Sequence, residues 1–203
     1  MKPASTVQCK DFPCLDTQQQ SHFIPDIVVD PKRVSILLIS EVPPANRADY
    51  YYAGPDALFA KTTVLAFQDA GAKVESVQDI LSLGVYLTTA IKCGKTGSGV
   101  ATSTIEHCSH LLEKESALFP NVKVFLLMGD VAIKSVNMIA KRNGEPRVIP
   151  AGSTYKIRGG EFHFRGARAF PSYVQSGPAF FVEKSKRKMI ADDIRQALAL
   201  VTK

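Results

Sequence analysis

The sequence predicts an α/β fold, a three-layer α/β/α sandwich with a mostly parallel four-stranded central sheet. Four short apolar runs are each followed by glycine, proline or polar residues, and they alternate with stretches in which apolar residues recur at helical spacing. Such alternation is typical of parallel strands covered by helices on both faces. Because the 203 residues contain no internal repeat and no second-domain linker, we expect one domain over residues 1–203.

The predicted strands carry the apolar and β-branched residues of a buried parallel sheet. They are residues 34–39, 85–91, 122–128 and 167–170. The predicted helices are residues 57–70, 77–83, 103–119, 131–142 and 182–201. Gly71 supplies a C-terminal stop, Ser103 and Glu106 fit a capping box, and Asp130 is a good N-cap.

Two segments do not fit the strand–helix alternation. Residues 1–33 have no clear periodicity, so we expect an extended N-terminal arm packed on the domain. Residues 143–166 are rich in glycine and contain strand-like pieces at 155–158 and 161–165, which predict a β-hairpin.

Composition narrows the class of protein. The chain is 45% apolar and 22% charged, which is typical of a globular protein. It has no apolar run approaching the roughly 18 residues that cross a bilayer, and its N-terminus lacks the apolar stretch of a secretory signal. We therefore expect a cytoplasmic protein with no membrane partner. A net charge of +6 favours a polyanionic partner, although many basic proteins bind none.

The chain has four cysteines, Cys9, Cys14, Cys93 and Cys108. In a reducing compartment such thiols are either buried core residues or metal ligands. Cys9 and Cys14 form a C-x4-C pair in the polar arm, where no core element is evident, whereas Cys93 follows a strand and Cys108 begins a helix. Two distant pairs can make a four-thiolate site for zinc or an iron–sulfur cluster, and spacing alone does not choose between them.

The loop after the first predicted strand gathers a carboxylate and aromatic residues. Ser40 and Glu41 come first, followed by two prolines and then by Tyr50, Tyr51 and Tyr52. Ligand sites of open α/β sheets lie outside the carboxyl ends of the strands. The loop is therefore a candidate site, and the alternative is an ordinary connection in which Glu41 is solvated and the tyrosines pack.

Several stretches together resemble the uracil-DNA glycosylase superfamily, closest to its iron–sulfur members. SEVPP at 40–44 resembles the G-E-x-P-G loop, TTAIKC at 88–93 resembles T-N-x-x-K-C, TIEHC at 104–108 resembles E-I-x-x-C, and FPSY at 170–173 resembles H-P-[SA]-Y. Residues 122–136 match the strand–glycine–helix segment between them. The resemblance covers nearly the whole chain, and the four cysteines occur in the family's order.

The resemblance implies a structural [4Fe-4S] cluster on the four cysteines, with zinc as the fallback. It implies that Glu41 stabilises a cationic sugar or orients water, and that one of the three tyrosines stacks on a base flipped out of the DNA. It also places the base-binding positions of the family at Ser40, Thr89 and Phe170.

Two of these positions depart from the family. Thr89 stands where the family has an asparagine that reads the uracil edge, and Phe170 stands where it has a histidine that stabilises the departing base. Losing one preorganised donor typically costs roughly 10²- to 10³-fold in rate. Classical uracil excision is therefore expected to be weak unless Ser172, Thr154 or Lys92 supplies a replacement donor.

Further residues are expected to meet the DNA backbone. They are Lys92, Lys156, Arg158, Arg165, Arg168, Ser172, Tyr173 and the basic residues between 184 and 188. The alternative for the last group is a solvated helix face.

The sequence thus predicts a monomeric DNA glycosylase that removes uracil or another deaminated base from DNA. One alternative is a catalytically weak or inactive family member that binds nucleic acid. A third hypothesis is a nucleoside or nucleotide enzyme on the same fold.

Overall fold

A computed structural model describes residues 1–201 and confirms the α/β class, with a central sheet of five strands instead of four. In sheet order these are β3 (Val85–Thr89), β2 (Ile36–Ser40), β5 (Val124–Met128), β7 (Ala167–Ser172) and β6 (Phe162–Phe164). The first four run parallel, and β6 pairs antiparallel with β7 at the edge. The carboxyl ends of β2, β5 and β7 therefore meet at one edge of the sheet.

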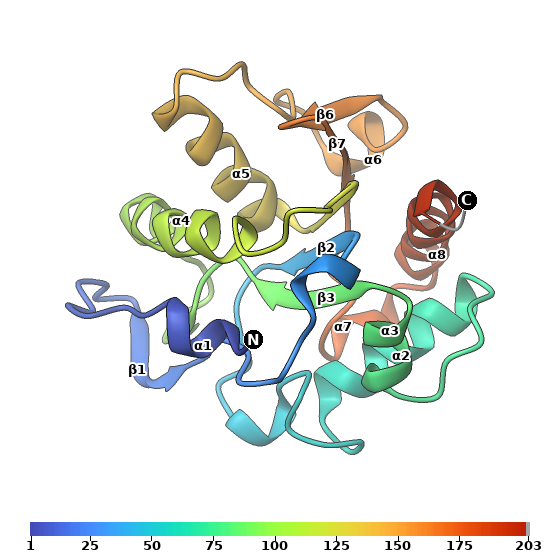
Figure 1. Ribbon diagram of the computed structural model, residues 1–203, viewed down its shortest axis with the longest axis horizontal. Helices are drawn as coiled ribbons and strands as arrows, with labels where there is room; N and C mark the ends of the chain where they lie inside the picture. The colour runs from blue at the N-terminus through green and yellow to red at the C-terminus, as the bar shows by residue number, and fades with distance from the viewer. Residues whose placement is uncertain (202–203) are drawn as a thin grey trace.

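Helices cover both faces of the sheet (Figure 1). On one face lie α2 (Leu58–Asp69), α3 (Val77–Ser82) and α8 (Lys184–Val201), and on the other lie α4 (Thr102–Ser116) and α5 (Asp130–Arg142). Successive strand residues point to opposite faces, so Leu38 packs in the first layer and Leu37 in the second. The strands are buried on both faces, which explains their continuous apolar runs.

Short helical turns occupy the connections. They are α1 (Pro3–Thr6), η1 (Pro31–Arg33), η2 (Arg47–Asp49), α6 (Thr154–Ile157) and α7 (Ala179–Val182). Asn46 caps η2 by accepting the Ala48 N–H at 3.1 Å, which gives the tyrosine-containing loop after β2 a defined path.

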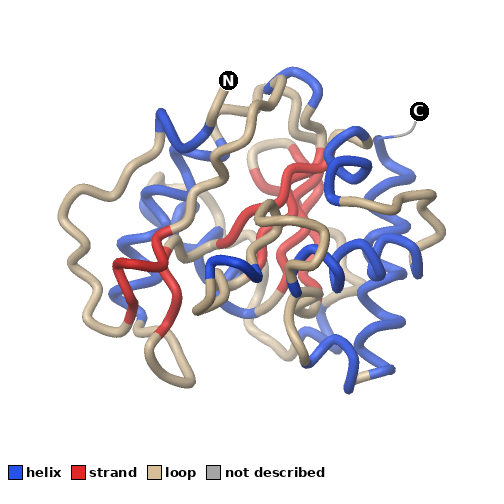
Figure 2. Tube along the Cα trace, turned by 90° about the horizontal axis from the view of Figure 1, so that it is seen from below, coloured by secondary structure: helices blue, strands red, loops and turns tan. Residues whose placement is uncertain are grey.

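The N-terminal arm has regular structure that its sequence did not reveal. β1 (Thr17–His22) pairs antiparallel with β4 (Cys93–Lys95), and His22 lies opposite Cys93. Figure 2 shows this two-stranded ribbon apart from the central sheet. This pairing attaches the arm to the segment that follows β3, next to Cys93.

The hairpin expected within residues 143–166 is displaced along the chain. Residues 155–158, expected as a strand, fall largely in the helical turn α6, and the hairpin instead joins β6 to β7. Its two-residue turn is Arg165-Gly166, with φ of +50° and +80°, as a type I′ turn requires. The left-handed arginine is held by Glu113 and Glu145 and lies over the Phe164 ring.

Within residues 1–201, no helix is both long and apolar enough to span a membrane.

Candidate functional site

A cleft of about 430 Å³ opens at the edge where the carboxyl ends of β2, β5 and β7 meet. Each strand contributes the residues that directly follow it or end it, as expected for a ligand site of an open α/β sheet. The lining side chains and loops are Glu41, Gly129, Asp130, Gly152, Ser153, Thr154, Ser172, Tyr173, Val174, Ala179, Glu183 and Lys186.

Glu41 is fixed at the floor of this cleft by the start of α5. Its Oε1 accepts the N–H of Val131 at 3.2 Å, one of the first-turn amides that have no partner inside the helix. A Cβ at Gly129, where φ is +107°, would lie 2.5 Å from the same oxygen. Only glycine allows this approach. The Oε2 atom has no hydrogen-bond partner in residues 1–201, so the carboxylate is held by one oxygen and available through the other.

Ser172 enters the cleft from the end of β7 with its proton already committed. Its Oγ donates to Asp193 Oδ2 at 2.6 Å, and Arg158 Nη2 donates to the other oxygen of Asp193 at 2.7 Å. Burial raises the pKa of Asp193, and the hydrogen bonds from Ser172 and Arg158 offset only part of that effect. Ser172 is fully buried and its hydroxyl proton is engaged, so it has no free proton to donate to a ligand.

Thr154 and Tyr173 present the uncommitted polar groups of the cleft. The Thr154 hydroxyl makes no hydrogen bond to another group within residues 1–201. Tyr173 is half-buried, and the ammonium of Lys186 lies 5.3 Å from its ring centroid. Lys186 also pairs with Glu183 at 2.6 Å. The cleft thus contains both the carboxylates of Glu41 and Glu183 and the hydroxyl of Thr154.

Three of the expected base-binding residues lie inside the protein. Tyr50 and Tyr51 are 4% and 1% exposed, and Tyr50 stacks on Phe23 with ring centroids 4.8 Å apart. Tyr51 donates to Ser40 at 2.6 Å, and Ser40 donates to Gln175 at 2.9 Å, which closes a buried polar network. These side chains shape the loop behind Glu41 and do not form an open surface for a flipped base.

The remaining base-binding residues are also held by the core. Thr89 is fully buried and donates to the carbonyl of Ile91 at 2.7 Å. Tyr52 donates to the carbonyl of Leu87 at 3.1 Å. Phe170 lies inside β7, packs in the layer with α8 and carries the Arg168 guanidinium 4.5 Å above its ring. None of the three lines the cleft.

The phosphate contacts expected from Lys92 and Arg168 do not fit the structure. Lys92 is fully buried, where its ammonium pairs with Glu115 and donates to Thr88 Oγ1 at 2.9 Å. Arg168 donates to the carbonyls of Phe162 and Gly160, both at 2.9 Å. Because each group is already satisfied within the fold, neither is free to bind a phosphate.

The ion-pair partner of Lys92, Glu115, was not predicted from the sequence. Glu115 is 1% exposed and also accepts from Tyr86 at 2.7 Å, so one carboxylate ties α4 to the end of β3. A signal was present, since a lysine between Ile91 and Cys93 directly follows a buried strand. Its partner lies on a distant helix and could not be identified from spacing.

The four cysteines converge where the arm meets the end of β3. Cys93 and Cys108 are buried, and Cys9, Cys14 and Cys108 line one cavity of about 390 Å³. Burial, together with the neighbouring thiols, raises the pKa of Cys93 to about 12 and that of Cys108 to about 11. The other three cysteines all lie close enough to Cys93 for their charges to raise its pKa. In residues 1–201 no three histidine, cysteine or acidic side chains are grouped closely enough to hold a single metal ion.

His22 borders the thiols from the arm. Its Nδ1 lies 3.5 Å from the sulfur of Cys93, and the Phe12 ring meets its imidazole edge-on at 5.1 Å. Burial lowers the pKa of His22, and the charges of Lys92 and Arg47 lower it further. The neutral imidazole can therefore serve as a hydrogen-bond partner of the Cys93 thiol.

Comparison with protein-family models finds no match, and comparison with curated proteins finds none either.

Proposed function

We propose that the protein is a DNA glycosylase that removes uracil or another deaminated base by base flipping and hydrolysis of the N-glycosidic bond. The observation that carries the proposal is Glu41, which lines the cleft at the carboxyl edge of the sheet and is held there by a backbone amide through one carboxylate oxygen. The resemblance of the loop that carries Glu41, of the Lys92-Cys93 segment and of the FPSY segment supports the same activity.

Glu41 suits the central step of this reaction. The sugar gains cationic character as the bond to the base breaks, and a carboxylate stabilises that charge or orients the attacking water. Anchoring one oxygen to Val131 leaves the other to face the sugar without reorganisation. The cleft volume of about 430 Å³ is in the range that holds a small ligand group.

The departing base needs a hydrogen-bond donor, and Thr154 is the best candidate of the three considered from sequence. Lys92 is buried in its ion pair, and the hydroxyl of Ser172 already donates its hydrogen bond to Asp193. Thr154 lines the cleft with a hydroxyl that no other group within residues 1–201 engages. We assign to Thr154 the donor role that the histidine performs in the family.

The cysteines fit a structural [4Fe-4S] cluster by donor type and number, with zinc as the fallback, and either group would draw the four thiols closer together than they lie here. Cys9 and Cys14 would hold it from the arm, and Cys93 and Cys108 from the domain. Such a group would fasten the arm and take no part in base excision.

The alternative is a family member that binds nucleic acid without excising a base. The position of Thr89 and Phe170 favours it, because these residues occupy the positions of the family's base-reading and leaving-group residues and both are buried.

Base excision on defined oligonucleotides tests the proposal. Single- and double-stranded substrates containing uracil, hypoxanthine or xanthine are incubated with the purified protein and with Glu41→Gln. We expect release of one of these bases, reduced roughly 10²- to 10⁴-fold by Glu41→Gln, with DNA binding retained. Glu161→Gln, which changes an exposed carboxylate outside the cleft, is the matched control. No release from any substrate, by folded protein that holds its metal, would leave only the binding alternative.

A further inference from the structure

The imidazole of His22 is placed against a cysteine by the pairing of two strands. In the ribbon of β1 and β4 (Figure 2), His22 is the residue of β1 that lies opposite Cys93. Directly beyond this pair, the Phe23 N–H donates to the carbonyl of Lys92 at 2.6 Å. The Nδ1 atom of His22 lies 3.5 Å from the sulfur of Cys93, within hydrogen-bonding reach for a sulfur atom. The backbone on both sides therefore fixes this contact.

Phe12 connects the same imidazole to the segment that carries the other two arm ligands. Its ring meets His22 edge-on, with the ring centroids 5.1 Å apart. Its backbone has a φ of +43°, a left-handed conformation that a bulky residue keeps only where its surroundings hold it. Because Phe12 stands between Cys9 and Cys14 in the chain, its contact with His22 holds the C-x4-C segment near Cys93.

Hydrogen-bond donors also reach the two buried thiols from other directions. Burial raises the pKa values of Cys93 and Cys108, whereas a hydrogen bond from the Thr17 side chain to Cys93 and one from the backbone N–H of Lys92 to Cys108 act in the opposite direction. A donor stabilises a thiolate more than a thiol, because the charged sulfur is the stronger acceptor. These surroundings suit the thiolate form, which is the form that binds a metal.

We propose that His22 is a positioning residue of the thiolate site, and that its Nδ1–H donates to the sulfur of Cys93 and slows release of the metal group held there. This inference rests on the metal group of the proposed function, the [4Fe-4S] cluster or its zinc fallback, and does not depend on base excision. A metal-bound thiolate has no proton and can only accept, so the proton of this contact lies on Nδ1. Hydrogen bonds of this kind orient metal ligands and raise the affinity of a site for its metal.

Two substitutions separate the hydrogen bond from the packing of the ring. His22→Phe keeps a ring against Phe12 and removes the donor, whereas His22→Asn removes the ring and offers an amide N–H near the position of Nδ1. Each protein is purified without oxygen, and release of iron and zinc to EDTA is followed with time. We expect His22→Phe to release its metal roughly 10- to 100-fold faster than wild type, because loss of such a hydrogen-bond partner typically costs 10- to 100-fold in metal affinity. His22→Asn should stay within about threefold of wild type, because it keeps a donor.

His110→Phe is the matched control. His110 is exposed, lines the cavity of Cys9, Cys14 and Cys108, and makes no hydrogen bond to a thiol within residues 1–201. The same substitution there should leave metal release unchanged. In protein that holds the cluster, His22→Phe should also have a more negative reduction potential than wild type, since a hydrogen bond to a cluster sulfur favours the reduced, more negative state.

Nitrogen-15 NMR of labelled histidine locates the proton without any substitution. In wild-type protein loaded with zinc, which is diamagnetic, we expect a protonated Nδ1 on His22. An Nδ1 that carries no proton, or that binds the metal itself, would overturn the inference even where His22→Phe does not fold.

The outcomes separate this inference from the proposed function. Equal metal release by wild type and His22→Phe overturns the inference, and equally fast release by His22→Phe and His22→Asn does so too, because it assigns His22 a packing role. Wild-type protein that holds neither iron nor zinc overturns the inference together with the metal group. Faster release by His22→Phe without base excision by wild type supports the inference and removes the glycosylase assignment, and base excision with equal release does the reverse.

Discussion

Two hydroxyl groups in the cleft differ in what they can offer a ligand. Ser172 donates to the buried carboxylate of Asp193, whereas the Thr154 hydroxyl has no partner within residues 1–201. Ser172 ends β7 and bonds to α8, whereas Thr154 is the first residue of α6, so the difference is built into the fold. It leaves the proton of Thr154 unused and that of the fully buried Ser172 engaged.

Thr154→Val tests this division. The substitution keeps the side-chain volume and removes the proton donor. For the substrate whose base the wild-type protein releases, we therefore expect the excision rate to fall by roughly 10²- to 10³-fold with little change in DNA affinity. Single-turnover kinetics measure the chemical step directly. Ser172→Ala is the comparison, and it should cost less than about tenfold in the same assay because the proton of Ser172 is not available to the base. The reverse ranking of the two variants would contradict the assignment.

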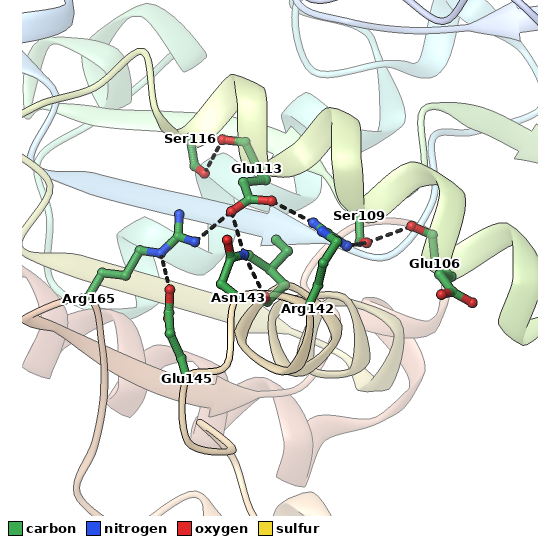
Figure 3. A network of polar contacts seen from close by, with 9 residues as sticks. Glu106, Ser109, Glu113, Ser116, Arg142, Asn143, Glu145 and Arg165 are labelled. Atoms are coloured by element: carbon green, nitrogen blue, oxygen red, sulfur yellow. Dashed lines mark hydrogen bonds and ion pairs between the residues drawn. The ribbon is translucent and has the colours of Figure 1, made fainter.

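At the scale of secondary-structure elements, one carboxylate joins three of them. Glu113 on α4 accepts from Arg142 at 2.6 Å and Asn143 at 2.9 Å at the end of α5, and from Arg165 in the β6–β7 turn at 2.5 Å (Figure 3). Arg165 in turn donates to Glu145 at 3.0 Å. The network secures the layer opposite α8 and supports the left-handed conformation of Arg165.

Glu113→Gln should lower the free energy of unfolding at pH 7 by about 1–2 kcal/mol, because it weakens charge-assisted hydrogen bonds to two arginines. Burial alone would raise the pKa of Glu113, but the hydrogen bonds and charges of Arg142 and Arg165 outweigh it and hold that pKa below the ordinary 4.5. A lowered pKa means that this stabilisation is present above pH 4.5 and is lost as the pH falls through the pKa of the folded protein.

Urea unfolding at pH 7 and pH 3 measures this effect. The difference between wild type and Glu113→Gln should shrink at pH 3, whereas Glu145→Gln, with one arginine contact, should show a smaller difference at both. Equal unfolding free energies of wild type and Glu113→Gln at pH 7 would show that the network contributes nothing.

The elements were predictable to different degrees for physical reasons. The continuous apolar runs of β2, β3 and β5 follow from burial on both faces, so local pattern alone located them. The β6–β7 hairpin was displaced in the prediction because its turn is Arg-Gly, and the left-handed arginine is stabilised by Glu113 from a distant helix. β1 was missed because its polar residues gain their strand pairing only from β4.

At the scale of the whole molecule, the sequence predicted the position of the candidate site better than it predicted which side chains line it. Glu41 follows a recognisable strand, and the edge of a parallel sheet gathers such residues. Whether Tyr51, Thr89 or Lys92 faces that edge or the interior depends on packing between elements far apart in sequence.

The arm and the domain are joined around the thiols. The Phe23 N–H donates to the carbonyl of Lys92 at 2.6 Å, and the Lys92 side chain is anchored to Glu115. Within the arm, the N-terminal amine donates to the Val29 carbonyl at 2.7 Å. A group bound by all four cysteines would therefore connect the arm to the end of β3, close to the loop that carries Glu41.

Cys14→Ser tests that connection. In protein purified without oxygen we expect about four iron atoms and visible absorbance in wild type, and loss of both in the variant. Because binding of a structural metal group contributes to folding, the variant should also melt at least about 5 °C lower and be cleaved faster in the arm by protease. Leu15→Ser is the matched control, since Leu15 is 99% exposed next to Cys14 and its replacement leaves all four thiols in place. Finding about one zinc per chain and no iron would show that the bound metal is zinc and not the cluster. Unchanged iron content and melting temperature in Cys14→Ser would show that Cys14 is not a ligand.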